Sequence, residues 1–370
     1  MRILVSGAGI AGLAAGINLG ATGNDVTIVE RANHLRVNGS PIDVRGDALD
    51  VARSMGVLGQ VHARRVTMTE RSQFIDAHGT VVAELPVSEI NDSEHDIEIP
   101  REDLAHILHE ALIPTTPLVF GESIAELHDD GAGVDVTFAS GRQDRFDLVI
   151  GADGMHSLTR RLTFGPESDY LKHLGFYVAL TDLPAARQNG DRTSPFLNWP
   201  GHMIGIARYN DTALGVLSFR SDWIDYDYHD LDAQKQILLD AFAGHDEWRV
   251  PEILDAVRND PELYFDSVSQ IHMSTWHRGR VVLVGDAAHC TSNLSGRGAS
   301  LAITGTWLLA QALHNHPADL EAAFEEYENN QRPYVTRAQD SVGPGGDLIM
   351  PATQEALDAR NERLRAMTRG

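Results

Sequence analysis

The chain begins Met1-Arg2-Ile3-Leu4-Val5-Ser6-Gly7-Ala8-Gly9-Ile10-Ala11-Gly12-Leu13, and this stretch decides the fold. Its first apolar run predicts a buried β-strand, Gly7–Gly12 has the pattern GxGxxG, and the small residues that follow predict a helix. Gly7 permits a tight turn, Gly9 lets a pyrophosphate approach the backbone, and Gly12 lets the helix pack on the strand. The stretch therefore predicts a dinucleotide-binding βαβ unit.

The second strand of this unit ends in an acidic residue that can form hydrogen bonds to the hydroxyls of a ribose. Residues 25–29 form another apolar run, and Glu30 follows at about the twenty-residue spacing of a ribose-binding acid. The amides of Ile10 and Ala11 open the intervening helix, whose N-terminus attracts phosphate groups. Arg31 favours a 2′-phosphate, whereas Glu30 repels one, so this first motif leaves FAD, NAD and NADP open.

Two later apolar strands also end in acids. Asp153 and Gly154 follow the run at 147–151, and Gly285 and Asp286 follow the run at 280–284. Because the carboxyl ends of parallel strands share one edge, a single Rossmann-like sheet would bring these acids and Glu30 to one rim.

A glycine-rich run after Asp286 leads into a further apolar helix. This run ends at Gly298 and Ala299, and the helix continues from Leu301 to Leu313. A glycine-rich approach to a helix N-terminus offers backbone amides to an anion or a carbonyl group. The sequence therefore predicts a second backbone site on the same rim.

Together these three motifs resemble those of the single-component FAD-dependent monooxygenases of class A, the p-hydroxybenzoate hydroxylase type. Within that family the chain is most similar to the compact tetracycline-modifying and actinobacterial natural-product enzymes. The segments Gly39–Gly46, Pro100–Leu104, Trp276–Arg280 and Gln331–Pro333 extend the resemblance over nearly the whole chain, with least support in 65–99 and 173–267.

The resemblance implies an α/β fold, in which a Rossmann-like FAD-binding domain carries an inserted antiparallel β-sheet substrate domain and C-terminal helices. The FAD-binding domain would comprise residues 1–68, 101–172 and 268–318, and the substrate domain 69–100 and 173–267. Residues 319–370 would form the C-terminal helices.

The resemblance also implies the roles of individual residues. Glu30 would bind the adenosine ribose, the first glycines the pyrophosphate, and Asp286 the ribityl or pyrophosphate region. Arg45 and Asn293 are the candidate catalytic residues, Asn293 standing where relatives often carry a proline. Asp153 has an alternative interpretation as a helix cap. The implied cofactor-binding residues are Gly7, Gly9, Ile10, Ala11, Gly12, Glu30, Arg31, Arg45, Arg101, Asp153, Gly154, Arg160, Gly285, Asp286, Gly298 and Ala299.

The implied function is an NAD(P)H- and O2-dependent hydroxylation, or another oxygenation, of an aromatic or polyketide-like small molecule through a C4a-hydroperoxyflavin. FAD would be the cofactor and NAD(P)H the co-substrate, and the enzyme would act in antibiotic biosynthesis or modification. One alternative is an FAD-dependent dehydrogenase or reductase without oxygen transfer. An alternative of another class is a non-catalytic dinucleotide-binding protein.

The composition restricts the partners. The 370 residues carry a formal net charge of −23, which disfavours nucleic acid and anionic membranes as partners. Cys290 is the only cysteine, and no HExxH pattern occurs, so no metal site is expected. We expect a soluble, cytoplasmic monomer or homodimer that acts on a small aromatic or polycyclic substrate and O2.

Between the motifs, the sequence predicts a hairpin at 65–87, antiparallel strands within 173–220, and helices near 232–244 and 250–258. Helices are also expected at 319–339 and 352–367, separated by a glycine-rich break from Val342 to Asp347. Six residues of the strand region could line a substrate pocket: Trp199, His202, Arg208, Tyr209, Phe219 and Arg220.

Overall fold

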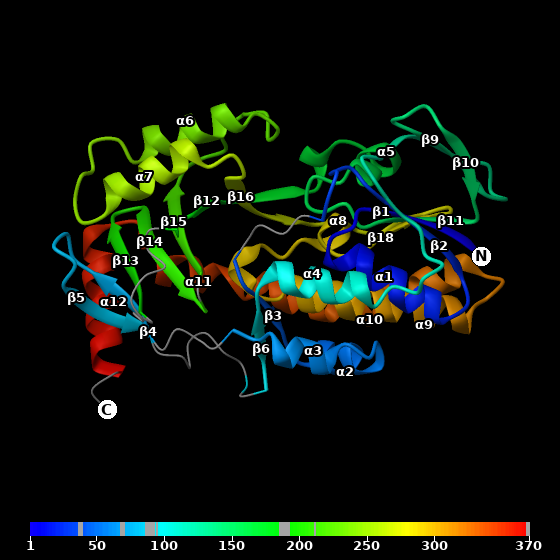
Figure 1. Ribbon diagram of the computed structural model, residues 1–370, viewed down its shortest axis with the longest axis horizontal. Helices are drawn as coiled ribbons and strands as arrows, with labels where there is room; N and C mark the ends of the chain where they lie inside the picture. Colours follow the sequence, from blue (N-terminus) through cyan, green and yellow to red (C-terminus); the bar gives the residue numbers. More distant parts are fainter. Residues whose placement is uncertain are drawn as a thin grey trace.

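The computed structural model describes residues 1–35, 40–66, 71–85, 93, 95–184, 193–210 and 212–367. Gly39, the first residue of one flavin-like segment, and the predicted domain boundary between residues 68 and 69 lie outside the described residues. Figure 1 shows an elongated molecule, with a helix-rich part at the N-terminal strands and a large sheet at the opposite end.

A six-stranded sheet carries the three motifs. Its strand order is β17-β18-β11-β1-β2-β7. Strands β18, β11, β1, β2 and β7 run parallel to one another, and β17 pairs antiparallel with β18 at the edge. The predicted Rossmann-like sheet is therefore confirmed. The strands are β1 (Arg2–Ser6), β2 (Asp25–Glu30), β7 (Leu118–Phe120), β11 (Leu148–Gly151), β17 (His277–Arg278) and β18 (Val281–Leu283).

Both faces of this sheet are covered, which explains why its strands are almost continuously apolar. Four helices share the main hydrophobic core on one face, and a three-stranded sheet packs through Ile124, Val136 and Phe146 on the other. The helices are α1 (Ile10–Ala21), α4 (Arg101–Glu110), α9 (Gly298–Asn315) and α10 (Leu320–Asp340). The small sheet comprises β8 (Ile124–Asp129), β9 (Val134–Phe138) and β10 (Gln143–Phe146).

The second large sheet has seven strands in the order β16-β12-β15-β14-β13-β4-β5. Helices α6 and α7 lie over one of its faces, as Figure 1 shows. Its strands are β4 (Arg71–Ile75), β5 (Val81–Leu85), β12 (Leu171–Asp182), β13 (Thr193–Trp199), β14 (His202–Tyr209), β15 (Thr212–Arg220) and β16 (Tyr264–Ile271). The helices are α6 (Leu231–Ala241) and α7 (Val250–Asn259).

Strands β12 and β16 connect the two large sheets. They pair with each other, and the backbone amide of Ile271 donates to the carbonyl of Cys290, close to the third motif. The expected boundaries at 172/173 and 267/268 fall within these two strands. The division into domains remains a prediction.

The remaining elements lie at the junction and at the chain end. A two-stranded sheet pairs β3 (Ile42–Val44) with β6 (Ile97–Ile99). The other helices are α2 (Asp47–Ser54), α3 (Leu58–Ala63), α5 (Leu158–Phe164), α8 (Asp286–His289), α11 (Val342–Ile349) and α12 (Gln354–Met367), with 3-10 turns at Glu167–Asp169 and Asn293–Ser295.

Most of the predicted local elements are confirmed, including the hairpin β4–β5, whose turn residue Asp76 accepts hydrogen bonds from the amides of His78 and Thr80. The predicted glycine-rich break from Val342 to Asp347 is wrong, because α11 is a helix there. Glycine lowers helix propensity, but a Cβ at Gly346 would lie 2.8 Å from the Phe176 ring. Close packing against the sheet therefore outweighs local propensity.

None of the helices in the described ranges combines the length and the apolar character that a membrane span requires.

Candidate functional site

The glycine loop after β1 has the geometry of a phosphate cradle. Gly7 has φ +103°, and a Cβ there would lie 2.5 Å from the Ala152 carbonyl oxygen. A Cβ at Gly12 would overlap the carbonyl oxygen of Gly7. A Cβ at Gly9 would meet no atom within 4 Å. Gly7 and Gly12 are therefore required by the protein itself, whereas Gly9 borders open space.

The amides at the start of α1 face this space without a side-chain partner. Gly9 is the N-cap, and no side chain caps the helix. The first amides of a helix lack intrahelical acceptors and attract anions. The start of α1, at Ile10 and Ala11, can therefore receive a phosphate.

Glu30 lies beside the same loop. Its carboxylate accepts a hydrogen bond from the amide of Ala8 at 2.8 Å and another from the amide of Ala32 at 2.8 Å. A carboxylate has about four acceptor positions, so two remain for hydroxyl donors. The position fits a ribose diol next to the pyrophosphate.

The third motif meets the first from the other side. Gly285 has φ +60°, and a Cβ there would lie 2.8 Å from the Ala11 Cβ. Asp286 follows directly, and its Oδ1 would be 3.9 Å from a Cβ at Gly298, the first residue of α9. The glycine loop, Asp286 and the start of α9 therefore converge on one rim, as the sequence predicts.

Two arginines approach this rim. Arg45 is 8% exposed, its amide donates to Ser300 Oγ at 2.9 Å, and its guanidinium pairs with Asp43 at 2.9 Å. Arg101 begins α4. Burial raises the pKa of Asp286, and the positive charge of Arg101 opposes this rise. Both arginines thus bring positive charge to the side of the rim that includes α9.

Asp153 and Arg160 make contacts within the protein. Asp153 accepts hydrogen bonds from Ser157 Oγ and from the amide and hydroxyl of Thr159 at 2.9 Å, so it caps the first turn of α5 together with the N-cap residue Ser157. Arg160 is 0% exposed and donates to the carbonyls of Met155 and Ala287. The described contacts make these two residues braces between α5 and the third motif, and their cofactor contacts remain predictions.

Arg31 and Asn293 are both exposed. Arg31 Nη1 lies 3.1 Å from His229 Nε2, in the loop that precedes α6. Asn293 begins a 3-10 turn directly after Ser292, whose φ of +71° is uncommon for a residue with a side chain. The strained Ser292 indicates that this loop is held in a defined shape. The catalytic role of Asn293 remains a prediction.

A histidine clamp joins the second motif to the seven-stranded sheet, and the sequence reasoning missed it. His156 lies 2.9 Å from Glu167 and 3.3 Å from Asp266, and its ring stacks on Tyr228 at 4.4 Å. Burial alone would lower the pKa of His156, but the two carboxylates outweigh burial and raise it to about 9. Only the fold brings these four residues together, so no sequence signal marks the clamp.

The candidate pocket-lining residues separate onto different faces. Trp199, His202 and Phe219 stack around Phe242, on the sheet face that packs on α6 and α7, and their role in a substrate pocket remains a prediction. Arg220 lies on the opposite face, with its guanidinium 4.4 Å from the Phe176 ring. Strand residues alternate between faces, and the sequence does not tell which face meets the motifs.

The opposite face is apolar and packs on the loop that precedes α9. A cluster of Phe176, Val178, Met203 and Met350 includes the partly buried Leu294 of that loop. Two surface hollows lie elsewhere, a groove of about 780 Å³ along α10 and one of about 310 Å³ beside β4, β5 and α12. Trp199, one of the six candidate pocket residues, lines the second hollow, but no residue of the three motifs lines either one. The motifs and not these hollows therefore define the cofactor site.

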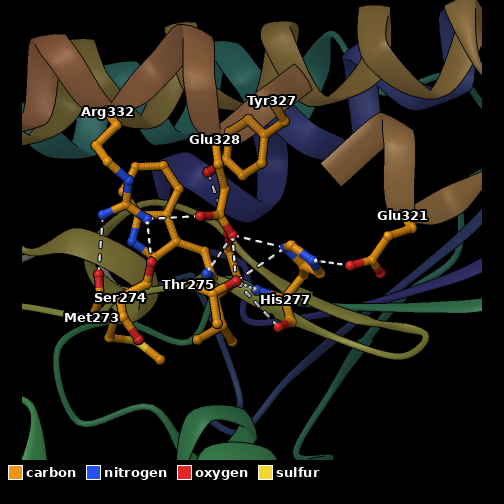
Figure 2. Close-up of polar contacts among 10 residues, drawn as sticks. Met273, Ser274, Thr275, His277, Glu321, Tyr327, Glu328 and Arg332 are labelled. Carbon is orange, nitrogen blue, oxygen red and sulfur yellow. Dashed lines mark hydrogen bonds and ion pairs between the residues drawn. The ribbon is translucent and has the colours of Figure 1, made fainter. Parts of the chain in front are cut away.

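A buried polar network supports the third motif from behind (Figure 2). Glu328 accepts hydrogen bonds from Thr275 Oγ1 at 2.8 Å, from the Trp276 amide, from His277 Nδ1 at 2.7 Å and from Arg332 Nη2 at 2.7 Å. The Trp276 ring lies between the Arg332 guanidinium and the His289 ring of α8. The network therefore attaches α10 to β17 and the segment before it, and β17 pairs with β18, the strand that leads to Asp286.

Cys290 provides a direct test of the packing around the third motif. The side chain is 6% exposed and donates to the Ser269 carbonyl, and burial followed by the charge of Asp286 raises the pKa of its thiol well above the usual range. We expect the folded protein to react with a thiol reagent roughly 100-fold more slowly than the unfolded chain. Rapid modification of one thiol in the folded protein would contradict this placement.

These residues fit FAD. The open space at Gly9, the uncapped start of α1, the acid beside it and the glycine-led start of α9 provide separate contacts for a pyrophosphate, a ribose and a ring carbonyl. Among the described residues, no three His, Cys, Asp or Glu side chains are grouped as metal ligands would be.

Comparison with known proteins agrees with this fit. The family described as "FAD binding domain" matches residues 1–178 and 264–342. A flavin-dependent monooxygenase of Legionella longbeachae serogroup 1 (strain NSW150) is 35% identical over 344 residues, which cover 92% of this chain and 87% of that protein. An uncharacterized protein of Mycobacterium tuberculosis (strain ATCC 25618 / H37Rv) is 39% identical over 367 residues, 96% of each chain.

Solved structures share the whole architecture. The tetracycline destructase Tet(51) superimposes with a TM-score of 0.86 at 32% identity, covering 98% of this chain and 95% of that one. HpxO of Klebsiella pneumoniae, solved with FAD and uric acid, has a TM-score of 0.75 at 22% identity, covering 99% and 93% of the two chains. The second likeness concerns the fold alone.

Proposed function

Since this chain belongs to the FAD-binding family of flavin-dependent monooxygenases, we propose that it uses NAD(P)H and O2 to hydroxylate an aromatic or polyketide-like small molecule. The protein is an FAD-dependent enzyme, and the proposal concerns the compound that reduces the flavin and the compound that is oxygenated. The observation that carries it is the convergence of three motifs on one rim, opposite an apolar sheet face. When bound, FAD supplies the redox chemistry and the activation of oxygen.

The protein's own residues would hold and orient the cofactor. Gly9 and the first amides of α1 bind the pyrophosphate, and Glu30 binds the adenosine ribose. Asp286 binds the ribityl region, and the amides of Gly298 and Ala299 face the ring. Arg45 and Arg101 provide positive charge near the ring, where reduction adds negative charge.

The apolar cluster would exclude water from the reacting end. Phe176, Val178 and Met203 lie on the sheet face that packs on Leu294, and Met350 joins them from the end of α11. A flat apolar substrate would bind between this face and the flavin loop. A site that excludes water prevents activated oxygen from being released before it reacts with the substrate. A solved structure that is 32% identical to this chain is named a tetracycline destructase, so tetracycline, a polycyclic compound with enol and phenol groups, is the first substrate to test.

The test uses purified protein, NADPH, NADH and tetracycline as the probe. We expect a yellow protein whose NAD(P)H consumption depends on O2 and rises with an accepted substrate, and a product that carries one oxygen atom from 18O2. Flavin reduction by a substrate without NAD(P)H, or turnover without 18O in the product, would favour the dehydrogenase alternative. Rejection of tetracycline with incorporation into simpler phenols would alter only the substrate class.

A further inference from the structure

Two carboxylates face each other on the small sheet β3–β6, next to the proposed flavin loop. Asp43 and Glu98 are directly opposite in the antiparallel register, so their side chains lie on the same face. The flanking residues Ile42, Val44, Ile97 and Ile99 turn toward the main core. Like charges opposite each other in a sheet repel, so the arrangement favours one proton on the pair.

This pair lies against the loop that leads into α9. A Cβ at Gly296 would lie 3.2 Å from Asp43 Oδ2 and 3.7 Å from Arg45 Nη2. Ser300, in the first turn of α9, donates from its hydroxyl to the Asp43 carbonyl at 2.9 Å and accepts from the Arg45 amide. The carboxylates and the glycine loop therefore form one connected unit.

The charges around Glu98 do not pair with it. Arg45 pairs with Asp43 at 2.9 Å and approaches Asp96 at 3.9 Å. The charged side chains of α3 and the turn after it, His62 and Arg64, are exposed. Arg297 precedes α9, and Arg101 begins α4. Within the described part of the chain, no hydrogen bond or ion pair reaches the Glu98 carboxyl group.

We propose that Glu98, opposite Asp43, is the proton-exchanging residue of the flavin-ring pocket, taking up a proton when the flavin is reduced and releasing it on reoxidation. This inference rests on the proposed function, because it requires FAD in the rim. Hydride transfer from NAD(P)H leaves the flavin with one more negative charge, and the proton comes from solvent to a Glu98 oxygen. Glu98 forms no bond to the flavin and acts through charge, as a positioning residue.

The electrostatics of the free carboxyl group support this role. Burial, followed by the negative charge of Asp43, raises the pKa of Glu98 to about 7, although Arg45 opposes the rise. A nearby anion favours the neutral form of a carboxyl group. A reduced flavin would therefore bind the proton to Glu98 more tightly, whereas the oxidised flavin would let it leave near neutral pH.

The decisive experiment measures the midpoint potential of the bound FAD from pH 5 to pH 9. We expect the plot for the wild-type protein to change slope near pH 7, where reduction becomes coupled to the extra proton. Glu98→Gln should remove this change, and Asp43→Asn should move it to lower pH. Glu126→Gln, on the exposed surface of β8, is the matched control and should leave the plot unchanged.

A slope change that persists in Glu98→Gln, or its absence from the wild-type plot, would overturn the proposal. Stability provides a second readout that does not depend on turnover. The folded pKa of Glu98 lies above its ordinary value of 4.5, so ionising it destabilises the protein as pH rises from about 4.5 to 7. Glu98→Gln should therefore gain melting temperature relative to wild type across this range.

The midpoint potential and the melting temperature together distinguish a failure of the proposed function from a failure of the role proposed for Glu98. Protein that fails to bind FAD would contradict the proposed function and give no potential, yet its pH-dependent melting would still report the shared proton. Protein that binds FAD and consumes NAD(P)H with a potential insensitive to Glu98→Gln would contradict the inference alone.

Discussion

A Gly9→Val variant is expected to fold normally but to purify without FAD. The Cβ of residue 9 meets no atom within 4 Å, and Gly9 has φ −73°, which a residue with a side chain adopts without strain. The added side chain instead occupies the space that the pyrophosphate needs to approach the backbone. We expect FAD affinity to fall about 100-fold, equivalent to about 2.7 kcal/mol, in a fluorescence titration.

Gly59→Ala is the matched control for this variant. Gly59 lies inside α3, and its Cβ would also meet no atom within 4 Å. Replacing a helix glycine with alanine stabilises a protein by roughly 0.5–1 kcal/mol, so this variant should keep FAD and melt slightly higher. Normal FAD affinity in Gly9→Val would show that the pyrophosphate does not approach this glycine.

Glu328→Gln is expected to lower the free energy of unfolding by about 3 kcal/mol. The Glu328 side chain is 10% exposed. Its carboxylate accepts hydrogen bonds from His277, Arg332, Thr275 and the Trp276 amide at the same time (Figure 2). A neutral amide leaves the positive charge of Arg332 unbalanced and loses at least one acceptor. Chemical denaturation of the FAD-loaded protein would measure the loss.

The control is Glu326→Gln, two residues earlier on the same helix. Glu326 pairs with His316 at 2.7 Å, but both side chains are about one third exposed. Exposed ion pairs contribute about 0–1 kcal/mol, so this variant should unfold almost like the wild type. Equal losses in the two variants would contradict the role assigned to the buried network.

The same network has a defined pH window. Burial would raise the pKa of Glu328, but its hydrogen bonds outweigh burial and lower it to about 2, so its stabilisation is complete above about pH 4.5 and is lost toward pH 2. Hydrogen bonding to Glu328, opposed by burial, raises the pKa of His277, so its contribution is present below about pH 6.5 and is lost as pH rises through the raised value. The stability difference between wild type and Glu328→Gln should therefore be largest between about pH 4.5 and 6.5.

The residues of the rim could be predicted because each belongs to a motif of a few consecutive residues. The glycines at 7, 9 and 12, Glu30 and Asp286 each belong to a strand and the turn that follows it, and parallel pairing brings such turns to one edge. Asp153 shows where this reasoning ends. The same strand-end position serves the cap of α5, and only its contacts with Ser157 and Thr159 show that it does so.

Other features arise from pairings that are remote in sequence. Glu98 meets Asp43 only because β3 and β6 pair, and His156 meets Asp266 only because β16 returns beside the second motif. Helix α11 forms where the glycines alone predict a break, and at Gly346 the lack of a side chain allows close packing on Phe176.

By itself, the sequence determined the Rossmann-like core and the turns that can hold a dinucleotide, because the run of apolar residues and the glycine spacing act over a few positions. Only the tertiary structure decided which sheet face meets the rim, as Trp199 and Phe176 illustrate, and which carboxylates lie opposite each other in a sheet. The physical reason is that strand alternation defines two equivalent faces, and pKa shifts depend on neighbours that chain folding alone brings within a few ångströms.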